Sequence, residues 1–316
     1  MVAINPNVLR ELEAKRFEFS EVDLPRFQTG FPPQHLLLTL LGDFWTGRRE
    51  PLPSAALVAW LSEFDVNEAG ARAAIGRLSK RGNLDVVREG RYTSYRVADQ
   101  LVELLPYGSL HTQSFGYSRT GWNGEWTMVA ISIADDTRRV RMQLRSALEL
   151  LGYAALYDGV WVSPYPPNDR LQVTLTSYAE VSCTVIVGAV DTGVGRVSPS
   201  SAWDLVPLRA LYDRFVTTFA PITMRMRSGT MSDREALVAR VQVAYRWFVI
   251  ATVDPNLPAE LLPSDWPRNA ARDIFVDLYD ELGPRAEARV REVVRRYAPE
   301  LSERVTHNRT VQETTK

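Results

Sequence analysis

Seven basic side chains are gathered in one short segment of this sequence, between Gly70 and Val97. They are Arg72, Arg77, Lys80, Arg81, Arg88, Arg91 and Arg96, set against the two acids Asp85 and Glu89. The whole chain has a formal net charge of -1, so its cations are concentrated here rather than abundant throughout. Because guanidinium and ammonium groups pair with phosphate oxygens, the chemistry that this segment favours is contact with nucleic acid.

The first part of the segment predicts a helix that begins after Asn67, a suitable N-cap, and ends before Gly82. Its inward-facing residues are Ala71, Ala74, Ile75 and Leu78. Its outward-facing residues are Ala69, Arg72, Ala73, Gly76, Arg77 and Lys80. Small residues let a helix backbone approach closely while flanking cations meet phosphates. A helix that enters the DNA major groove needs this combination.

Further elements flank this helix in a recognisable order. Two apolar helices are expected before it, at His35–Trp45 and Ser54–Phe64, each behind prolines. Two short strands, Leu84–Arg88 and Tyr92–Val97, are expected after it, joined by a turn that contains Gly90. Three helices followed by a basic hairpin are the plan of a winged helix-turn-helix.

The sequence therefore predicts contacts with double-stranded DNA from the third helix and from the hairpin. An ordinary solvated basic face is the alternative for either element alone, but the order of elements, the small outward face and the basic hairpin together favour DNA. The predicted DNA-binding residues are Asn67, Arg72, Ala73, Gly76, Arg77, Lys80, Arg88, Arg91, Tyr92, Thr93 and Ser94.

Length and composition limit the class of protein. The chain has 316 residues, of which 45% are hydrophobic and 24% charged, which is typical of a soluble protein of two or three domains. No apolar run long enough to span a membrane and no signal-peptide core are evident, so a cytoplasmic location is expected. The single cysteine, Cys183, lies in an apolar run and is expected to be buried and inert.

Beyond the hairpin, the pattern changes to strands alternating with helices. Strands are expected at Trp126–Ala134 and Cys183–Val190, and a strand or bent hairpin at Tyr153–Ser163. Helices are expected at Asp136–Leu151 and Asn168–Ala179. This alternation over a short stretch predicts a small ferredoxin-like α/β sandwich.

A helical period dominates from Pro199 onward. The expected helices are Leu205–Phe219, Asp233–Thr252, Asn269–Gly283 and Pro284–Tyr297, separated by prolines that include Pro221. The expected fold class is α+β multidomain, with an N-terminal winged helix-turn-helix, a central ferredoxin-like sandwich and a C-terminal all-helical domain. The expected limits are an extension at 1–32, the winged helix at 33–105, a linker at 106–124, the central domain at 125–198, the helical domain at 199–298 and a polar, frayed tail at 299–316.

Several segments carry a resemblance to a known family. The segments TLLGDFW, VNEAGARAAIGRLSKRGNL and REGRYTSYRV are followed by RRVRMQLRSALELLGYAALYDGVWVSP and RWFVIATVDPNLPAELLPSDWP. In this order, over Pro33 to Tyr297, the chain resembles the PaaX-type transcriptional regulators, repressors of phenylacetate degradation genes. The resemblance implies a winged helix, a central domain like the small CRISPR adaptation nuclease and a helical C-terminal domain. It also implies a homodimer on a partly palindromic operator, released by an aryl-acyl-CoA thioester such as phenylacetyl-CoA.

The chain departs from the family pattern around the third helix. Ala69, Gly70 and Ala71 replace a more polar stretch, and Asn83 stands where an aromatic residue is common. The resemblance therefore does not transfer an operator sequence, and nothing in the residues identifies the effector.

An enzyme is the main alternative class. Asp135 and Asp136 stand where related nucleases hold a metal ion, so a Mg²⁺-dependent nuclease competes with acids that simply begin a helix. The latter is favoured, because His35, His111 and His307 are scattered and no phosphate-binding loop or nucleophile elbow is present. We expect no enzyme activity, metal or cofactor. A protein-interaction module with a vestigial winged helix is a second alternative.

The C-terminal helices are the expected place of an effector site. A CoA thioester needs cations for its phosphates and an apolar slot for its acyl group. The predicted effector-binding residues are Arg240, Arg246, Trp247 and Trp266, with ordinary packing and surface ion pairs as the alternative.

Overall fold

The computed structural model describes residues 32–116, 121–133, 138–178, 181–190 and 197–310, and shows an α+β protein with two small sheets. The expected N-terminal extension, up to residue 31, and the acids Asp135 and Asp136 lie outside these residues. Contacts divide the chain into two compact units. Of the described residues, unit 1 comprises those within 121–210 and 254–266, and unit 2 comprises 32–116, 211–253 and 267–310.

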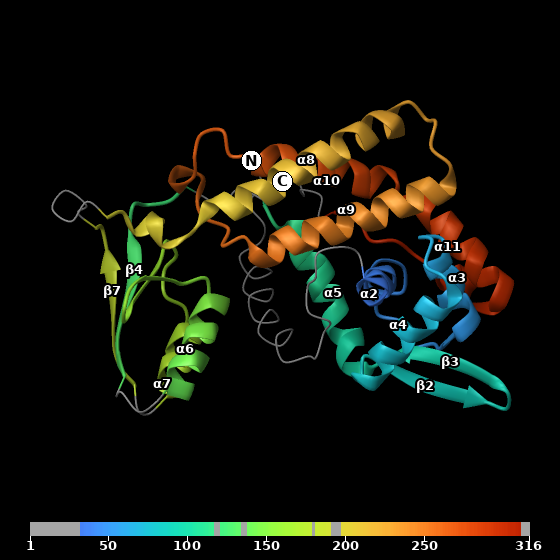
Figure 1. The fold of residues 1–316 in the computed structure, drawn as a ribbon, viewed down its shortest axis with the longest axis horizontal. Coiled ribbons are helices and arrows are strands. Elements are labelled where there is room, and N and C mark those ends of the chain that lie inside the picture. The colour runs from blue at the N-terminus through green and yellow to red at the C-terminus, as the bar shows by residue number, and fades with distance from the viewer. Residues whose placement is uncertain (1–31, 117–120, 134–137, 179–180, 191–196, 311–316) are drawn as a thin grey trace, which may run out of the picture. The chain divides into compact units, whose positions relative to one another are not determined.

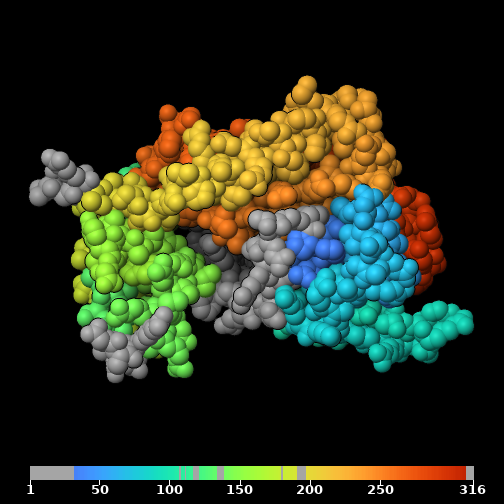
Figure 2. Space-filling model, in the orientation of Figure 1, coloured from blue at the N-terminus to red at the C-terminus, as the bar shows by residue number. Residues whose placement is uncertain are grey.

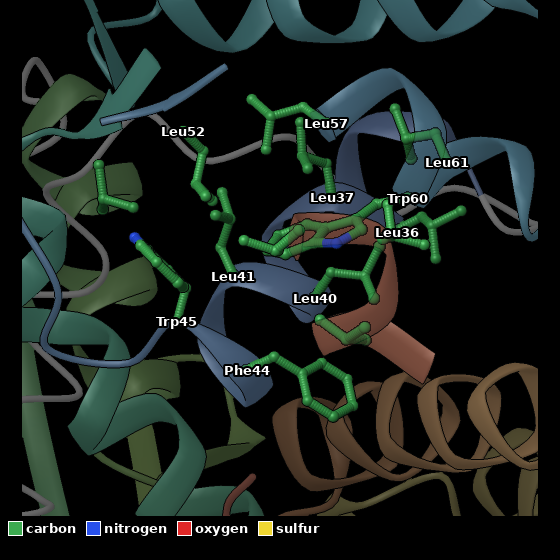
Figure 3. Close-up of a cluster of buried hydrophobic side chains, with 14 of the residues drawn as sticks. Leu36, Leu37, Leu40, Leu41, Phe44, Trp45, Leu52, Leu57, Trp60 and Leu61 are labelled. Atoms are coloured by element: carbon green, nitrogen blue, oxygen red, sulfur yellow. The ribbon is translucent and has the colours of Figure 1, made fainter. Parts of the chain in front are cut away.

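The N-terminal helices of unit 2 surround a dense apolar core (Figure 3). They are α2 (Pro33–Phe44), α3 (Ser54–Ser62) and α4 (Glu68–Lys80). The predicted inward residues of α4 are all buried, with Ala71 and Leu78 fully enclosed. Burial of a large aliphatic side chain contributes about 1.5–3 kcal/mol, so this packing holds α4 firmly against its neighbours. The predicted inward side of α4 is confirmed.

A three-stranded antiparallel sheet adjoins these helices. Its strands are β1 (Leu52–Pro53), β2 (Leu84–Glu89) and β3 (Tyr92–Val97), in the order β1-β3-β2. Gly90 turns the β2–β3 hairpin with φ 59°, a conformation that favours glycine. Strand β1 was not predicted, because two residues that include a proline carry no alternating pattern.

The C-terminal helices of unit 2 are α8 (Leu205–Arg227), which also enters unit 1, α9 (Asp233–Val253), α10 (Arg268–Glu281) and α11 (Gly283–Tyr297). Two of them, α9 and α11, share this core. Leu237 and Val241 of α9, with Val290 and Val294 of α11, belong to the same buried cluster as the leucines of α2. Figure 1 shows α3 and α11 side by side. Helices α2 to α4 and helices α9 and α11 therefore belong to one compact unit.

Helix α9 is long and apolar enough, by length and composition, to pass as a membrane span. However, 61% of the apolar stretch of this helix is buried inside the protein, as it is in a helix that forms part of a protein core. Its start is fixed by a reciprocal cap, in which the N–H of Ser232 donates to the Glu235 carboxylate at 2.8 Å and the N–H of Glu235 donates to Ser232 Oγ at 3.3 Å. The backbone hydrogen bond from Ser232, followed by the side chain of Arg225, lowers the pKa of Glu235 to about 2.

Three expectations about loops are wrong. Helix α5 (Asp99–Ser114) occupies the beginning of the expected linker, and it continues through Pro106 because its apolar face packs on α2 and α9. Helix α8 likewise continues through Pro221 to Arg227. The expected frayed tail forms a 3₁₀ helix, η3 (Pro299–Arg304), and then buries Val305. In each case tertiary burial outweighs the local preference of proline or polar residues.

Unit 1 contains a four-stranded sheet with two helices on one face. Its elements are β4 (Trp126–Ile133), α6 (Arg138–Leu150), β5 (Ala154–Tyr157), β6 (Val160–Ser163), α7 (Asp169–Thr176) and β7 (Val181–Gly188). The strand order is β5-β6-β4-β7, and every neighbouring pair is antiparallel. Leu144, Leu148 and Leu171 of the helices pack on Val129 of the sheet. Burial also raises the pKa of Tyr153 in this core to about 12.

The environment of Cys183 differs from the expected one. The thiol is exposed, as are all of residues 182–187 along β7, an edge strand of the sheet. The apolar run that predicted burial does mark a strand, but the described part of the chain leaves these residues uncovered.

The rest of unit 1 includes two short 3₁₀ helices, η1 (Pro199–Ala202) and η2 (Ala259–Leu261). Trp126 lies between Trp122 and Trp203, with ring centroids 5.1 and 6.1 Å away. The Arg209–Asp265 ion pair, at 2.7 Å, ties the start of α8 to the proline-rich segment 254–266. The segment therefore lies next to the start of α8 within unit 1.

Candidate DNA-binding site

The start of α4 is fixed by its own N-cap. The N–H of Gly70 donates to Asn67 Oδ1 at 2.8 Å. A Cβ at Gly70 would lie 3.1 Å from that oxygen, so glycine gives the cap the room that a larger residue would restrict. Such a cap is worth about 0.5–2 kcal/mol. Asn67 is exposed, but its side-chain oxygen serves the helix that carries the other predicted residues.

The middle of the outward face of α4 is open and small. Ala73 is exposed, and a Cβ built at Gly76 would meet no other atom within 4 Å. Lys80 lies exposed at the end of the same face, and no partner contacts it among the residues that the structure describes. This arrangement lets a large polyanion approach the helix backbone closely.

The two arginines on the flanks of this face have partners within the protein. Arg72 donates to Glu68 from Nε at 2.9 Å and from Nη2 at 2.7 Å. Arg77 donates from Nε to Gln34 Oε1 at 2.8 Å, which links α4 to α2. Arg77 therefore also positions α4. No sequence pattern indicated this role, because Arg77 and Gln34 are 43 positions apart.

The β2–β3 hairpin projects from the surface of unit 2 (Figure 2). Arg88 and Arg91 are exposed near its tip, and Tyr92 is 66% exposed. The Arg91 guanidinium lies 5.2 Å from the centre of the Tyr92 ring and donates to its hydroxyl at 3.0 Å. Thr93 and Ser94 are half-buried in β3. The exposed cations at the tip can pair with phosphates.

The connection between α4 and the hairpin is short and well hydrogen-bonded. Gly82 adopts φ 71°, and the N–H of Asn83 donates to the carbonyl of Leu78 at 2.9 Å. Asn83 itself is fully buried, and its carbonyl accepts from the N–H of Ala98 at 3.1 Å. Since these contacts fix β2 relative to α4, the predicted residues of both elements lie on one rigid scaffold.

A buried ion pair joins α2 to the C-terminal helices. Asp43, 4% exposed, accepts from Arg240 Nε and Nη2, each at 2.8 Å, and from the Tyr279 hydroxyl at 2.7 Å. Burial works against the charge of Arg240, but Asp43 and Tyr279 outweigh it, so the pKa of the guanidinium is raised. Burial, reinforced by Asp43, also raises the pKa of Tyr279 well above its usual value.

The predicted effector residues are not gathered at one place in unit 2. Arg240 is fully buried in the ion pair with Asp43, and Trp247 is fully buried against Phe275, with stacked rings 5.2 Å apart. Arg246 is exposed on α9, and Trp266 belongs to unit 1. Packing thus accounts for Arg240 and Trp247 without a ligand.

A second set of ion pairs braces the turn between α3 and α4. Glu63, at the C-cap of α3, accepts from Arg289 Nη2 at 2.9 Å and from its Nε at 3.1 Å. Hydrogen bonding to Glu63 raises the pKa of the Arg289 guanidinium. Arg234 donates from Nε to the carbonyl of Glu63 at 3.0 Å and pairs with Asp65 at 2.6 Å. Helices α9 and α11 therefore hold the turn that precedes α4.

Metal ligands are not assembled within the described part of the chain. No group of three or more His, Cys, Asp or Glu residues could hold an ion there. Asp135 and Asp136, the predicted alternative ligands, lie outside it.

Comparison with known proteins gives three consecutive matches. The PaaX-like protein family model matches residues 33–101, the PaaX central Cas2-like domain matches 119–197 and the PaaX-like C-terminal domain matches 203–292. The chain belongs to the PaaX-like family. A curated PaaX relative, the transcriptional repressor PaaX of Escherichia coli (strain K12), is 26% identical over 265 residues, which cover 81% of this chain and 82% of that protein.

Among solved structures, the PaaX-like chain is similar to an uncharacterized protein from Mycobacterium tuberculosis. The TM-score is 0.52 at 22% identity, covering 81% of this chain and 97% of that one, so this likeness concerns the fold alone. The PaaX-like family and its named repressor place this chain among transcriptional regulators rather than enzymes.

Proposed function

We propose that the chain is a sequence-specific DNA-binding repressor in which α2, α3, α4 and the β2–β3 hairpin form a winged helix-turn-helix. The observation that carries this proposal is the small, open outward face of α4 next to a projecting hairpin with exposed cations. Both elements are held by one buried core. A protein-interaction surface has no need of such a gathered set of cations in a chain of net charge -1.

In this function α4 lies in the major groove, with Ala73 and Gly76 facing the base edges and Lys80 close to a phosphate. Arg88 and Arg91 hold the DNA backbone or the adjacent minor groove. The protein acts as a homodimer on double-stranded operator DNA, with half-sites about 34–36 Å apart or a multiple of that distance. A cytoplasmic location follows from the DNA target.

The release signal is a small molecule such as an aryl-acyl-CoA thioester, bound by the C-terminal helices. Exposed Arg246 is the predicted residue that remains available for a phosphate. Because α9 and α11 brace α2 and the turn before α4, a ligand that moves these helices changes the position of α4. Such a ligand must bind the free and the DNA-bound conformations with different affinities.

We infer that unit 1 serves a repressor rather than a nuclease. Its strand order and its two helices on one face support a ferredoxin-like sandwich, a fold that hosts many unrelated functions and does not itself decide between them. The named relative is a repressor, so we do not adopt the nuclease alternative for this unit.

Mobility-shift titration with the intergenic duplex upstream of the chain's own gene tests the proposal. We expect binding that weakens steeply with salt and exceeds binding to a shuffled duplex. The exposed Arg91→Ala variant should weaken binding to both duplexes alike and lower the salt slope by about one, since it removes one phosphate contact.

Arg214→Ala serves as the matched control for Arg91→Ala, because it removes one exposed arginine from α8, outside the proposed interface. Its titration curves should coincide with those of the unchanged protein. If the unchanged protein binds neither duplex at any salt concentration, the proposed function is wrong.

A further inference from the structure

An acidic residue lies within the basic DNA-binding face. Glu68 occupies the first turn of α4 and its side chain is 67% exposed, next to Arg72, which is 60% exposed. Both hydrogen bonds from Arg72 end on the same oxygen, Glu68 Oε1. Within the described residues, Glu68 Oε2 and Arg72 Nη1 have no partner. The pair therefore presents a free acceptor and free donors side by side.

Helix stability alone is a weak reason for an acid at this position. An exposed ion pair four residues apart contributes about 0.3–0.5 kcal/mol, and a carboxylate near a helix N-terminus contributes a similar amount. A carboxylate that faces DNA phosphates lowers affinity unless it accepts a hydrogen bond from a base. The first turn of a recognition helix is also where side chains reach base edges.

We propose that Glu68 and Arg72 together recognise a G·C base pair in the major groove, an inference that rests on the DNA-binding function proposed above. Arg72 donates to O6 and N7 of guanine, and Glu68 accepts from the N4 amino group of cytosine. Guanine alone offers two adjacent acceptors for a guanidinium, and an A·T pair offers one acceptor beside a donor on adenine. Both halves of the pair therefore select G·C.

The surroundings of the pair fit this role. The neighbouring Ala69 and Ala73 are small and exposed, so the backbone of α4 can approach the bases closely enough for the short glutamate side chain to reach them. The existing hydrogen bonds also hold Arg72 in place before DNA arrives, which lowers the cost of ordering a long side chain. The pair is neutral as a unit and adds little to binding of random DNA.

Selection of binding sites from a random double-stranded oligonucleotide library, followed by sequencing, tests this inference on the full-length protein. The unchanged protein should enrich a G·C pair at one position in each half-site. Glu68→Gln leaves one oxygen to serve both Arg72 and the cytosine amino group, so it should reduce the preference for that pair by about tenfold. It should also raise affinity for random duplexes, because a negative charge near the phosphates is removed.

Two further variants separate base recognition from charge. Glu89→Gln removes an exposed acid from the hairpin, so it should raise affinity without changing base preference. Arg72→Lys keeps the charge but cannot form the two parallel hydrogen bonds to guanine, so it should lose preference at the same base pair as Glu68→Gln.

Three other outcomes would contradict either this inference or the proposed function. If Glu68→Gln raises affinity but leaves every base preference unchanged, Glu68 is only a repulsive charge and the inference is wrong. Loss of preference at different positions in Glu68→Gln and Arg72→Lys also overturns joint recognition of one base pair. If the unchanged protein enriches no sequence at all, the proposed function fails before this inference is reached.

Discussion

Asp43→Asn is expected to lower the free energy of unfolding by about 3–5 kcal/mol, the range for breaking one side of a buried ion pair. Asp43 is 4% exposed and Arg240 is fully buried, so the substitution removes the negative charge of the carboxylate that accepts two hydrogen bonds from the guanidinium. An asparagine amide also turns a donor towards Arg240 or Tyr279, where both oxygens of Asp43 now accept. Little water is available to replace the missing acceptor.

Chemical denaturation followed by tryptophan fluorescence and by far-UV circular dichroism measures this effect. Asp265→Asn is the control, since its partner Arg209 and Asp265 itself are both solvent-exposed and such pairs are worth about 0–1 kcal/mol. Because Asp43 lies on α2 and Arg240 on α9, the N-terminal and C-terminal helices of unit 2 should lose stability together. A decrease below about 1 kcal/mol for Asp43→Asn would show that the ion pair does not hold them.

Gly76→Leu is expected to weaken operator binding by about 2–4 kcal/mol without lowering stability. A Cβ at Gly76 meets no atom within 4 Å in the free protein, and leucine is the better helix former by roughly 0.5–1 kcal/mol. In the DNA complex, however, a leucine on this face holds the helix away from the base edges. Each hydrogen-bonded side chain that is thereby separated from its base weakens binding by about 1–3 kcal/mol.

Two measurements on the same preparation separate the effects of Gly76→Leu: thermal unfolding, and titration with operator DNA. Ser146→Leu, on the exposed side of α6, is the matched control and should change neither the melting temperature nor the affinity by much. Unchanged operator affinity in Gly76→Leu would mean that the outward face of α4 does not approach the DNA.

Local periodicity was sufficient to predict α4 and its buried side. Ala71, Ala74, Ile75 and Leu78 recur at helical spacing, and the structure buries all four. The same reasoning predicted the hairpin that carries the exposed Arg88 and Arg91, because its turn at Gly90 is encoded within a few residues.

Contacts between distant residues could not be predicted from one sequence. Gln34 and Arg77 are 43 positions apart, and Asp43 and Arg240 are 197 apart, so no local pattern relates them. Arg240 was predicted to bind the phosphates of an effector, because the sequence does not show that its buried partner is Asp43. Glu68 was not predicted to contact DNA, because that prediction rested on basic residues and Glu68 is the acid that accepts hydrogen bonds from Arg72.

Proline and polar residues misled the prediction of loops for one physical reason. Pro106 and Pro221 each lack an N–H, which costs a helical hydrogen bond, but the apolar residues around them bury enough surface to keep α5 and α8 continuous. The tail contains polar residues such as Asn308 and Thr310, which are partners of the core: Asn308 donates to the carbonyl of Gly42 at 2.8 Å.

Site-directed crosslinking measures whether the outward face of α4 lies against base edges in the major groove. Cys183 is exposed, so Cys183→Ser first removes the native thiol. A thiol-attached photocrosslinker is then placed at Ala73→Cys, or at Met224→Cys on α8 as a control, Met224 being 74% exposed. We expect crosslinks from position 73 to bases within the operator half-sites, and none from position 224. Equal crosslinking from both positions, or none from position 73 in a complex that still forms, would contradict this placement of α4.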